Sequence, residues 1–133
     1  MKIVLDTNCL LPAIFPRSIY HWVWERFRHG DFTLCYSTEI LAEYEEMLSR
    51  LYPPEMTENV MLLLINSRNV EKITSYFKWN LIFDDPDDNK FVDCALNAGA
   101  DCIVTNDRHF KVLKNIDFPK INVVNIDTFK SIS

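Results

Sequence analysis

Two acidic residues each follow a short run rich in β-branched side chains. Asp6 comes directly after Lys2–Leu5, and Asp107 follows residues 102–105 with one residue between. We predict that both runs are strands of one parallel sheet, so that both acids lie at the carboxyl edge, where ligands of open α/β sheets bind. Two carboxylates in one crevice repel each other unless a positive charge lies between them. The spacing therefore favours a cation at this edge.

A third acid, Asp88, opens a predicted helix over residues 88–98. Helical periodicity puts Asp88 near the centre of the apolar stripe, whereas Asp93 falls on the opposite face and is expected to point to solvent. A carboxylate aimed at the core must be hydrogen-bonded, neutralised or bound to a metal. The alternative is that Asp88 caps the helix by accepting backbone N–H groups. The preceding acids Asp84, Asp85 and Asp87 are expected to be exposed turn residues.

The predicted helix Thr38–Leu51 carries further acidic candidates. Its apolar stripe runs from Ile40 to Leu51 and should be buried, with Glu43 and Glu45 flanking it on opposite edges. Helical periodicity alone does not choose between these two glutamates. For either one, the default is a solvated helix face.

A set of oxygen ligands favours hard cations such as Mg²⁺ or Mn²⁺, whereas zinc or copper would want histidine or cysteine. The histidines His21, His29 and His109 show no ligand spacing among themselves. We expect His109 and its neighbour Phe110 to serve packing. Carboxylates around Mg²⁺ suit phosphoryl chemistry, in which the ion activates water and neutralises the phosphate. Acyl transfer is disfavoured, because the sequence has no nucleophile elbow.

The composition indicates one globular domain over residues 1–133. Apolar residues make up 48% of the chain and charged residues 25%, which excludes a disordered or collagen-like protein. The two glycines, Gly30 and Gly99, are far apart, so no glycine-rich loop can hold a nucleotide phosphate. The net charge of −5 excludes a broad basic surface, and any nucleic acid must be held by locally gathered cations.

The cysteines and the apolar segments bear on the compartment. The spacing of the cysteines matches neither a zinc pattern nor a disulfide framework. No stretch approaches the ~20 apolar residues of a membrane span. We therefore expect reduced, mostly buried thiols in a cytoplasmic protein that does not bind membranes.

Strand and helix patterns alternate, which is typical of an α/β fold with a parallel sheet between helices. Further strands are expected at residues 32–36, 70–73 and 123–125. Helices are expected at residues 8–15, 18–28, 55–67, 108–113 and 127–132. Ser18 should cap the second of these helices and Gly30 should end it. Residues 76–86 lack a clear period and should form a loop or part of a strand.

Four motifs follow one another along nearly the whole chain. They are Ile3-Val4-Leu5-Asp6-Thr7-Asn8, Ser37 with Glu43, Asp87-Asp88-Asn89-Lys90-Phe91 through Ala95, and Ile103-Val104-Thr105-Asn106-Asp107 with Phe110. Together they resemble the PIN-domain nucleases, and more narrowly the bacterial and archaeal PIN proteins related to VapC, the toxins of toxin-antitoxin pairs. The resemblance implies a PIN-like three-layer fold and divalent-metal-dependent cleavage of RNA by an endoribonuclease.

The resemblance also implies a role for each matching residue. The catalytic and metal-binding acids would be Asp6, Glu43, Asp88 and Asp107. The resemblance thus selects Glu43 rather than Glu45. Asp6 and Asp88 would be the main ligands of Mg²⁺ or Mn²⁺, Asp107 would bind directly or through water, and Glu43 would orient or activate water. The implied products carry 5′-phosphate and 3′-hydroxyl ends. The implied supporting polar residues are Thr7, Asn8, Ser37 and Asn106.

Partners follow from the same resemblance. RNA is the implied substrate, and the candidate RNA contacts are Arg17, Lys90, Arg108 and Lys111, each of which is by default a solvated charge. Related toxins commonly pair with themselves and with an antitoxin protein, so we expect a homodimer and an antitoxin.

Three rival functions share parts of this pattern. A Mg²⁺-dependent phosphatase of small esters would want an acid two residues after its aspartate nucleophile, and Asn8 occupies that position. A PIN-type nuclease of RNA processing or turnover would use the same site. A catalytically silent RNA- or protein-binding module would have little reason to keep four carboxylates that repel one another.

Overall fold

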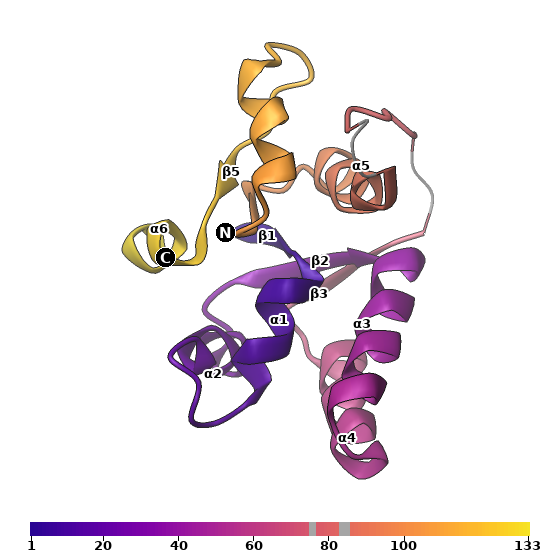
Figure 1. The fold of residues 1–133 in the computed structure, drawn as a ribbon, viewed down its shortest axis with the longest axis vertical. Coiled ribbons are helices and arrows are strands. Elements are labelled where there is room, and N and C mark those ends of the chain that lie inside the picture. Colours follow the sequence, from indigo (N-terminus) through magenta and orange to yellow (C-terminus); the bar gives the residue numbers. More distant parts are fainter. Residues whose placement is uncertain (75–76, 83–85) are drawn as a thin grey trace.

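The structure, a computed structural model, describes residues 1–74, 77–82 and 86–133. A five-stranded sheet forms its centre (Figure 1). The strand order is β3-β2-β1-β4-β5, and each neighbouring pair is parallel. The strands are β1 (Lys2–Leu5), β2 (Thr33–Ser37), β3 (Val70–Ile73), β4 (Cys102–Val104) and β5 (Val123–Val124). The expected α/β fold with a parallel sheet is confirmed.

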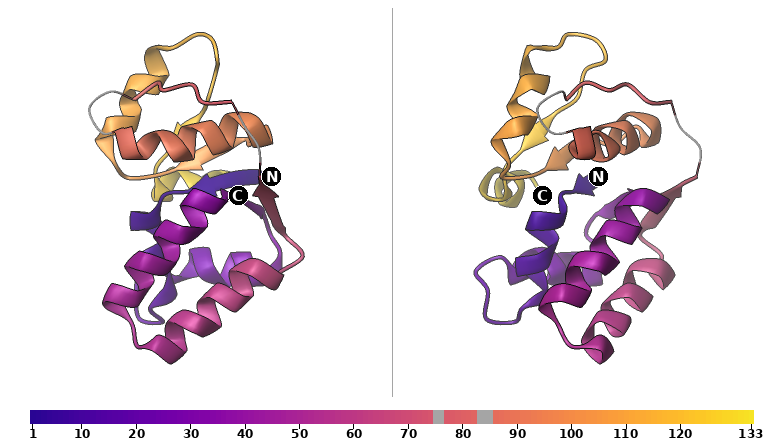
Figure 2. Two further views of the ribbon diagram at one scale, coloured as in Figure 1. Left: turned by 90° about the vertical axis from the view of Figure 1, so that its right-hand side faces the viewer. Right: turned by 45° about the vertical axis from the view of Figure 1, so that its right-hand side comes forward.

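Helices cover both faces of the sheet, which makes a three-layer architecture (Figures 1 and 2). One face carries α1 (Thr7–Ile14), α2 (His21–His29), α3 (Thr38–Leu51) and α4 (Pro54–Asn66). The other face carries the 3₁₀ turn η1 (Pro86–Asp88), α5 (Asn89–Ala98) and the 3₁₀ helix η2 (Arg108–Asn115). The last helix, α6 (Ile126–Ile132), packs Phe129 against Trp22 of α2, with ring centroids 5.8 Å apart.

The register of β1 and β4 brings two chain segments together at the carboxyl edge. Leu5 pairs with Val104, and the Asp6 N–H donates to the Val104 carbonyl at 3.0 Å. Both strands are fully covered by helices, since Ile3, Val4, Ile103 and Val104 are all inaccessible to solvent. Because both faces of these strands are buried, their sequences are apolar at successive positions.

Most predicted elements lie within a few residues of the observed ones. Helix α2 begins later than expected, at His21, and the expectation that Ser18 caps it is wrong, because Tyr20 is the N-cap. Ser18 lies in the preceding turn, where its Oγ accepts a hydrogen bond from the Tyr20 N–H at 3.1 Å. Gly30 does end this helix in the left-handed conformation, with φ of 81°, which favours glycine. The expectation that Leu51 is buried is wrong: at the end of α3 it is 62% exposed. The expectations for Asp84 and Asp85 lie outside the described residues.

Asp93 is buried, and the expectation that it faces solvent is wrong. Its side chain is covered by the extended segment 77–82, which runs along α5. Asp93 Oδ1 accepts a hydrogen bond from the Trp79 N–H at 2.8 Å, and Asn89 exchanges two hydrogen bonds with the backbone of Ile82. Side chains one turn apart on α5 thus satisfy backbone groups that would otherwise need a neighbouring strand.

The cysteines are buried free thiols, as the sequence predicted. Burial raises the pKa of Cys9 and Cys94 to about 12, which leaves little reactive thiolate near neutral pH. Within the part of the chain that the structure describes, no helix has the length and apolar character needed to cross a membrane.

Candidate metal centre

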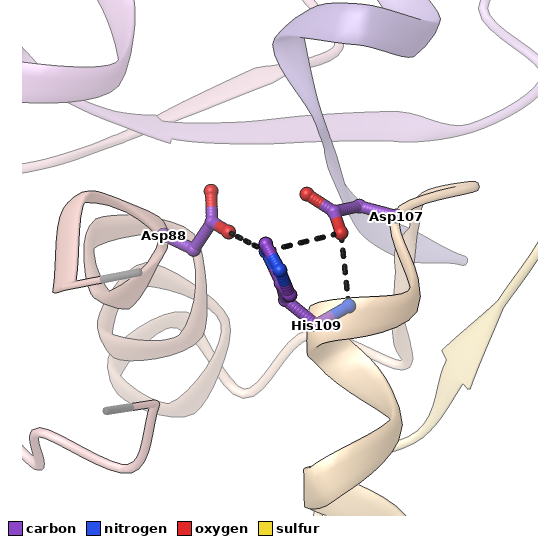
Figure 3. Close-up of side chains that lie close together, drawn as sticks. All are labelled: Asp88, Asp107 and His109. Carbon is purple, nitrogen blue, oxygen red and sulfur yellow. Dashed lines mark hydrogen bonds and ion pairs between the residues drawn. The ribbon is translucent and has the colours of Figure 1, made fainter. Parts of the chain in front are cut away.

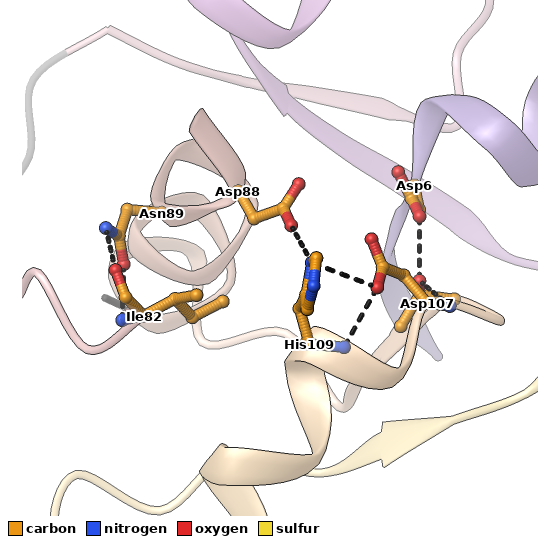
Figure 4. Close-up of polar contacts among 7 residues, drawn as sticks. Asp6, Ile82, Asp88, Asn89, Asp107 and His109 are labelled. Carbon is orange, nitrogen blue, oxygen red and sulfur yellow. Dashed lines mark hydrogen bonds and ion pairs between the residues drawn. The ribbon is translucent and has the colours of Figure 1, made fainter. Parts of the chain in front are cut away.

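The first acid of the site, Asp6, is held where β1 passes into α1. It is 4% exposed, and its Oδ2 accepts a hydrogen bond from the Thr105 hydroxyl at 2.7 Å. The Thr105 Oγ1 also accepts the Asp107 N–H at 3.0 Å, so one threonine joins the ends of β1 and β4 (Figure 4). Sequence reasoning did not give Thr105 a role. The available signal was its position directly after β4, beside Asp6 in the register.

Burial raises the pKa of Asp6 above the ordinary range of aspartate. The hydrogen bond from Thr105 opposes this shift, while the nearby Asp107 and Glu43 carboxylates raise the pKa further. The ionised form of Asp6 is therefore disfavoured by both low solvation and like charge. A bound cation would relieve both penalties.

Asp88, Asp107 and His109 form a compact group at the start of α5 and η2 (Figure 3). One potential ligand atom from each lies within 4.8 Å of the others. The His109 Nδ1 is 3.4 Å from Asp107 Oδ1 and 3.8 Å from Asp88 Oδ2. Asp107 Oδ1 also accepts the His109 N–H at 2.9 Å, which caps η2. Neither Asp6 nor Glu43 belongs to this group.

The positions of Asp88 and His109 in this group test two expectations from the sequence. Among the described residues, the Asp88 side chain makes no capping hydrogen bond to α5, so the capping alternative is not observed. His109 was expected to serve packing, but its ring lies between two carboxylates and its side chain is 40% exposed. Its neighbour Phe110 is completely buried and packs edge-on against Phe91. In the sequence, the place of His109 in the first turn after Asp107 could have indicated that it lies near this acid.

Glu43 projects from α3 toward the start of α1. It accepts a hydrogen bond from the Thr7 hydroxyl, and its Oε1 lies 2.6 Å from the Lys90 Nζ. Its charge acts on Asp6, whereas Glu45 is exposed and faces the groove between α3 and α4. The structure thus brings Glu43 toward Asp6 and leaves Glu45 outside. Lys90, a candidate RNA contact, is here a largely buried partner of Glu43.

The remaining candidate residues lie outside the compact group of Asp88, Asp107 and His109. Ser37 is the N-cap of α3, where its Oγ accepts the Ile40 N–H at 3.2 Å. Asn106 accepts the Ile126 N–H at 3.2 Å, which ties the loop after β4 to α6. Both side chains therefore position elements that carry or border the acids. The exposed candidates are Asn106, Asn8, Arg17, Arg108 and Lys111.

The donor set fits a divalent cation. Asp88 and Asp107 offer carboxylate oxygens, and His109 offers a ring nitrogen, all within reach of one ion. Asp6 adds a buried carboxylate close enough to Asp107 for their charges to interact. Mn²⁺ and Mg²⁺ accept carboxylate ligands, and an imidazole nitrogen suits a first-row transition metal better than Mg²⁺.

Comparison with known proteins identifies the family of the chain. Residues 2–109 match the model of the PIN domain, and the chain therefore belongs to the PIN-domain family. The fold resembles a chain of VapBC2 from Rickettsia felis, whose crystal structure holds a DNA fragment from their promoter. That match has a TM-score of 0.61 and 21% identity over 94% of this chain and 98% of that one.

A second solved structure shares the fold. FitAcB from Neisseria gonorrhoeae matches with a TM-score of 0.58 and 15% identity, over 93% of this chain and 97% of that one. A search of curated proteins found no match. At these identities the two structures establish the likeness of fold, and the membership of the family rests on the domain match.

Proposed function

We propose that the protein is a Mg²⁺- or Mn²⁺-dependent endoribonuclease and the toxin of a toxin-antitoxin pair. The observation that carries the proposal is that acids from separate elements lie near one another at the carboxyl edge of the sheet. Asp88 and Asp107 belong to one compact group, and the nearby carboxylates of Asp107 and Glu43 raise the pKa of Asp6. Such a concentration of negative charge is costly without a cation, and membership of the PIN family makes a nuclease the natural use of it.

Each acid has a distinct part in the proposed reaction. Asp88 and Asp107, with Asp6 behind them, would hold the ion. The ion, when bound, would polarise the scissile phosphate and offset its charge. Glu43 is fixed by Thr7 and Lys90, so its carboxylate can orient a water molecule and accept its proton. Attack of that water on phosphorus, with departure of the 3′ oxygen, would yield 5′-phosphate and 3′-hydroxyl ends.

Exposed cations could contact the RNA. Arg108 and Lys111 lie on η2 next to His109, and Arg17 follows α1. Lys90 could also contact the RNA if the bound substrate separates Lys90 from Glu43. Thr7, Asn8, Ser37 and Asn106 would support the acids without touching phosphate.

The decisive experiment compares cleavage of a fluorescent single-stranded RNA by the wild type and by D6N and D88N variants. We expect cleavage with Mn²⁺ or Mg²⁺, none with a chelator, and loss of at least about 100-fold in rate for each variant. The control D127N removes an exposed acid from α6 and should cleave at the wild-type rate. Circular dichroism would establish that each variant is folded. Full activity in D88N would refute the proposal.

The rival activities are tested in the same preparation. Hydrolysis of a small phosphate ester without cleavage of RNA would favour a phosphatase. Mn²⁺ binding without turnover of any nucleic acid would favour a silent binding module. Either result would overturn the nuclease.

The toxin role needs an experiment of its own. The likeness to VapBC2 and FitAcB supports an antitoxin partner, and the homodimer remains an expectation from the family resemblance. Induced expression should arrest growth, D88N should not, and a small DNA-binding protein encoded immediately upstream should restore growth. Activity on RNA without growth arrest would instead favour a role in RNA processing or turnover.

A further inference from the structure

His109 combines a fixed position with a ring nitrogen that makes no hydrogen bond to the described residues. Its backbone N–H is bound by Asp107 at 2.9 Å, which anchors the residue at the start of η2. The Nδ1 atom is buried and, within the described ranges, accepts or donates no hydrogen bond. The side chain is nevertheless 40% exposed, so the accessible part of the ring lies away from Nδ1.

The distances around Nδ1 do not match a direct contact. They are 3.4 Å to Asp107 and 3.8 Å to Asp88 (Figures 3 and 4). A charged imidazolium would be expected to close to about 2.7–2.9 Å from a carboxylate oxygen. Ligand atoms around one cation, at about 2.1 Å from it, lie roughly 3 Å apart when adjacent and 4 Å apart when opposite. The two separations from Nδ1 lie between these values.

We propose that His109 Nδ1 is a direct ligand of the metal ion, so that Asp88, Asp107 and His109 form a mixed oxygen and nitrogen centre selective for Mn²⁺ over Mg²⁺. The proposal rests on the proposed function only in using the same metal site. A neutral imidazole with its proton on Nε2 presents the Nδ1 lone pair to the space between the two carboxylates. No other described His, Cys, Asp or Glu completes such a group.

The metal preference follows from ligand chemistry. Mg²⁺ prefers oxygen ligands and keeps several of its waters, so a ring nitrogen contributes little to its binding. Imidazole binds first-row transition metals more readily. Removal of His109 should therefore weaken binding of Mn²⁺ far more than binding of Mg²⁺.

Calorimetric titration with each metal alone tests this selectivity. Relative to the wild type, H109Q should bind Mn²⁺ at least about tenfold more weakly and Mg²⁺ within about threefold. The control H29Q changes an exposed histidine at the end of α2 and should leave both affinities unchanged. An H109Q variant with wild-type Mn²⁺ affinity, or with equal losses for the two metals, would overturn the proposal.

Pulsed electron paramagnetic resonance of bound Mn²⁺ gives a second, direct readout. The wild type should show hyperfine coupling to a histidine nitrogen, and isotopic labelling of histidine should alter that coupling. Because this measurement uses the wild-type protein, it stands even if H109Q fails to fold. Absence of the coupling would show that His109 is only a neighbour of the two acids.

These experiments separate the proposal from the nuclease function. They contain no RNA, so nitrogen coupling in a protein that cleaves nothing would leave the ligand assignment intact and refute the nuclease. Cleavage of RNA by a protein without nitrogen coupling would refute the ligand assignment alone.

Discussion

The Lys90–Glu43 pair allows a specific prediction about stability. Lys90→Met removes the ammonium that lies 2.6 Å from Glu43 and keeps most of the apolar stem. Glu43 would then remain near Asp6, whose carboxylate it already disfavours. We expect the metal-free variant to be less stable than the wild type, because a partly desolvated charge has lost its partner.

The exposure of the two side chains sets the magnitude. Lys90 is 14% exposed and Glu43 is 28% exposed, which lies between a surface pair and a buried pair. Breaking a buried pair costs about 3–5 kcal/mol, and exposed pairs contribute roughly 0–1 kcal/mol. An intermediate loss of about 1–3 kcal/mol corresponds to a fall in Tm of about 4–10 °C for a chain of this length.

Thermal and urea unfolding in the presence of a chelator measure the loss. The control K111M makes the same change in charge at an exposed position of η2 and should leave Tm within about 1 °C. Adding E43Q to K90M should restore about 1 kcal/mol or more of the free energy of unfolding, since the unpaired Glu43 charge is then removed. An unchanged Tm in K90M, or no recovery in the double variant, would refute the view that the ammonium compensates Glu43.

Two further predictions concern Asp6 and the core beneath the site. The pKa of Asp6 is raised in the folded protein. Between the ordinary aspartate pKa and this raised value, the native state binds more protons than the unfolded state. The stability of the metal-free protein therefore falls as pH rises through that range. D6N should therefore raise the metal-free Tm at pH 7, with a difference that shrinks toward pH 4; a D6N variant that melts below the wild type at pH 7 would contradict this sign. Phe110→Ala empties a fully buried position and should cost about 3–5 kcal/mol in urea unfolding, whereas Phe118→Ala, at a residue 84% exposed, should change stability by less than about 0.5 kcal/mol.

Local sequence patterns determined much of the frame of this site. The β-branched runs predicted β1 and β4, and the acids after them were correctly expected at one edge of the sheet. The period of α5 pointed Asp88 inward, and the structure has it beside Asp107 and His109. These features depend on the chain's own periodicity, which a sequence displays directly.

Tertiary packing decided the surroundings of each acid. Asp93 is buried because segment 77–82, which has no periodic pattern, lies against α5. Glu43 differs from Glu45 because α3 is oriented so that Thr7 and Lys90 meet only the former. Helical periodicity treated both glutamates alike, since it describes a helix without its neighbours.

The same reason accounts for His109 and Thr105. Neither shows ligand spacing or an unusual local pattern, and each gains its role from residues on other elements. The sequence determined the strands, the helices and the acids at their ends through short-range periodicity. Only the tertiary structure decided which side chains form an ion pair, accept from the same hydrogen-bond donor or lie around one cation. Those contacts join residues that are far apart along the chain, through the register of β1 and β4 and the packing of α3 and α5.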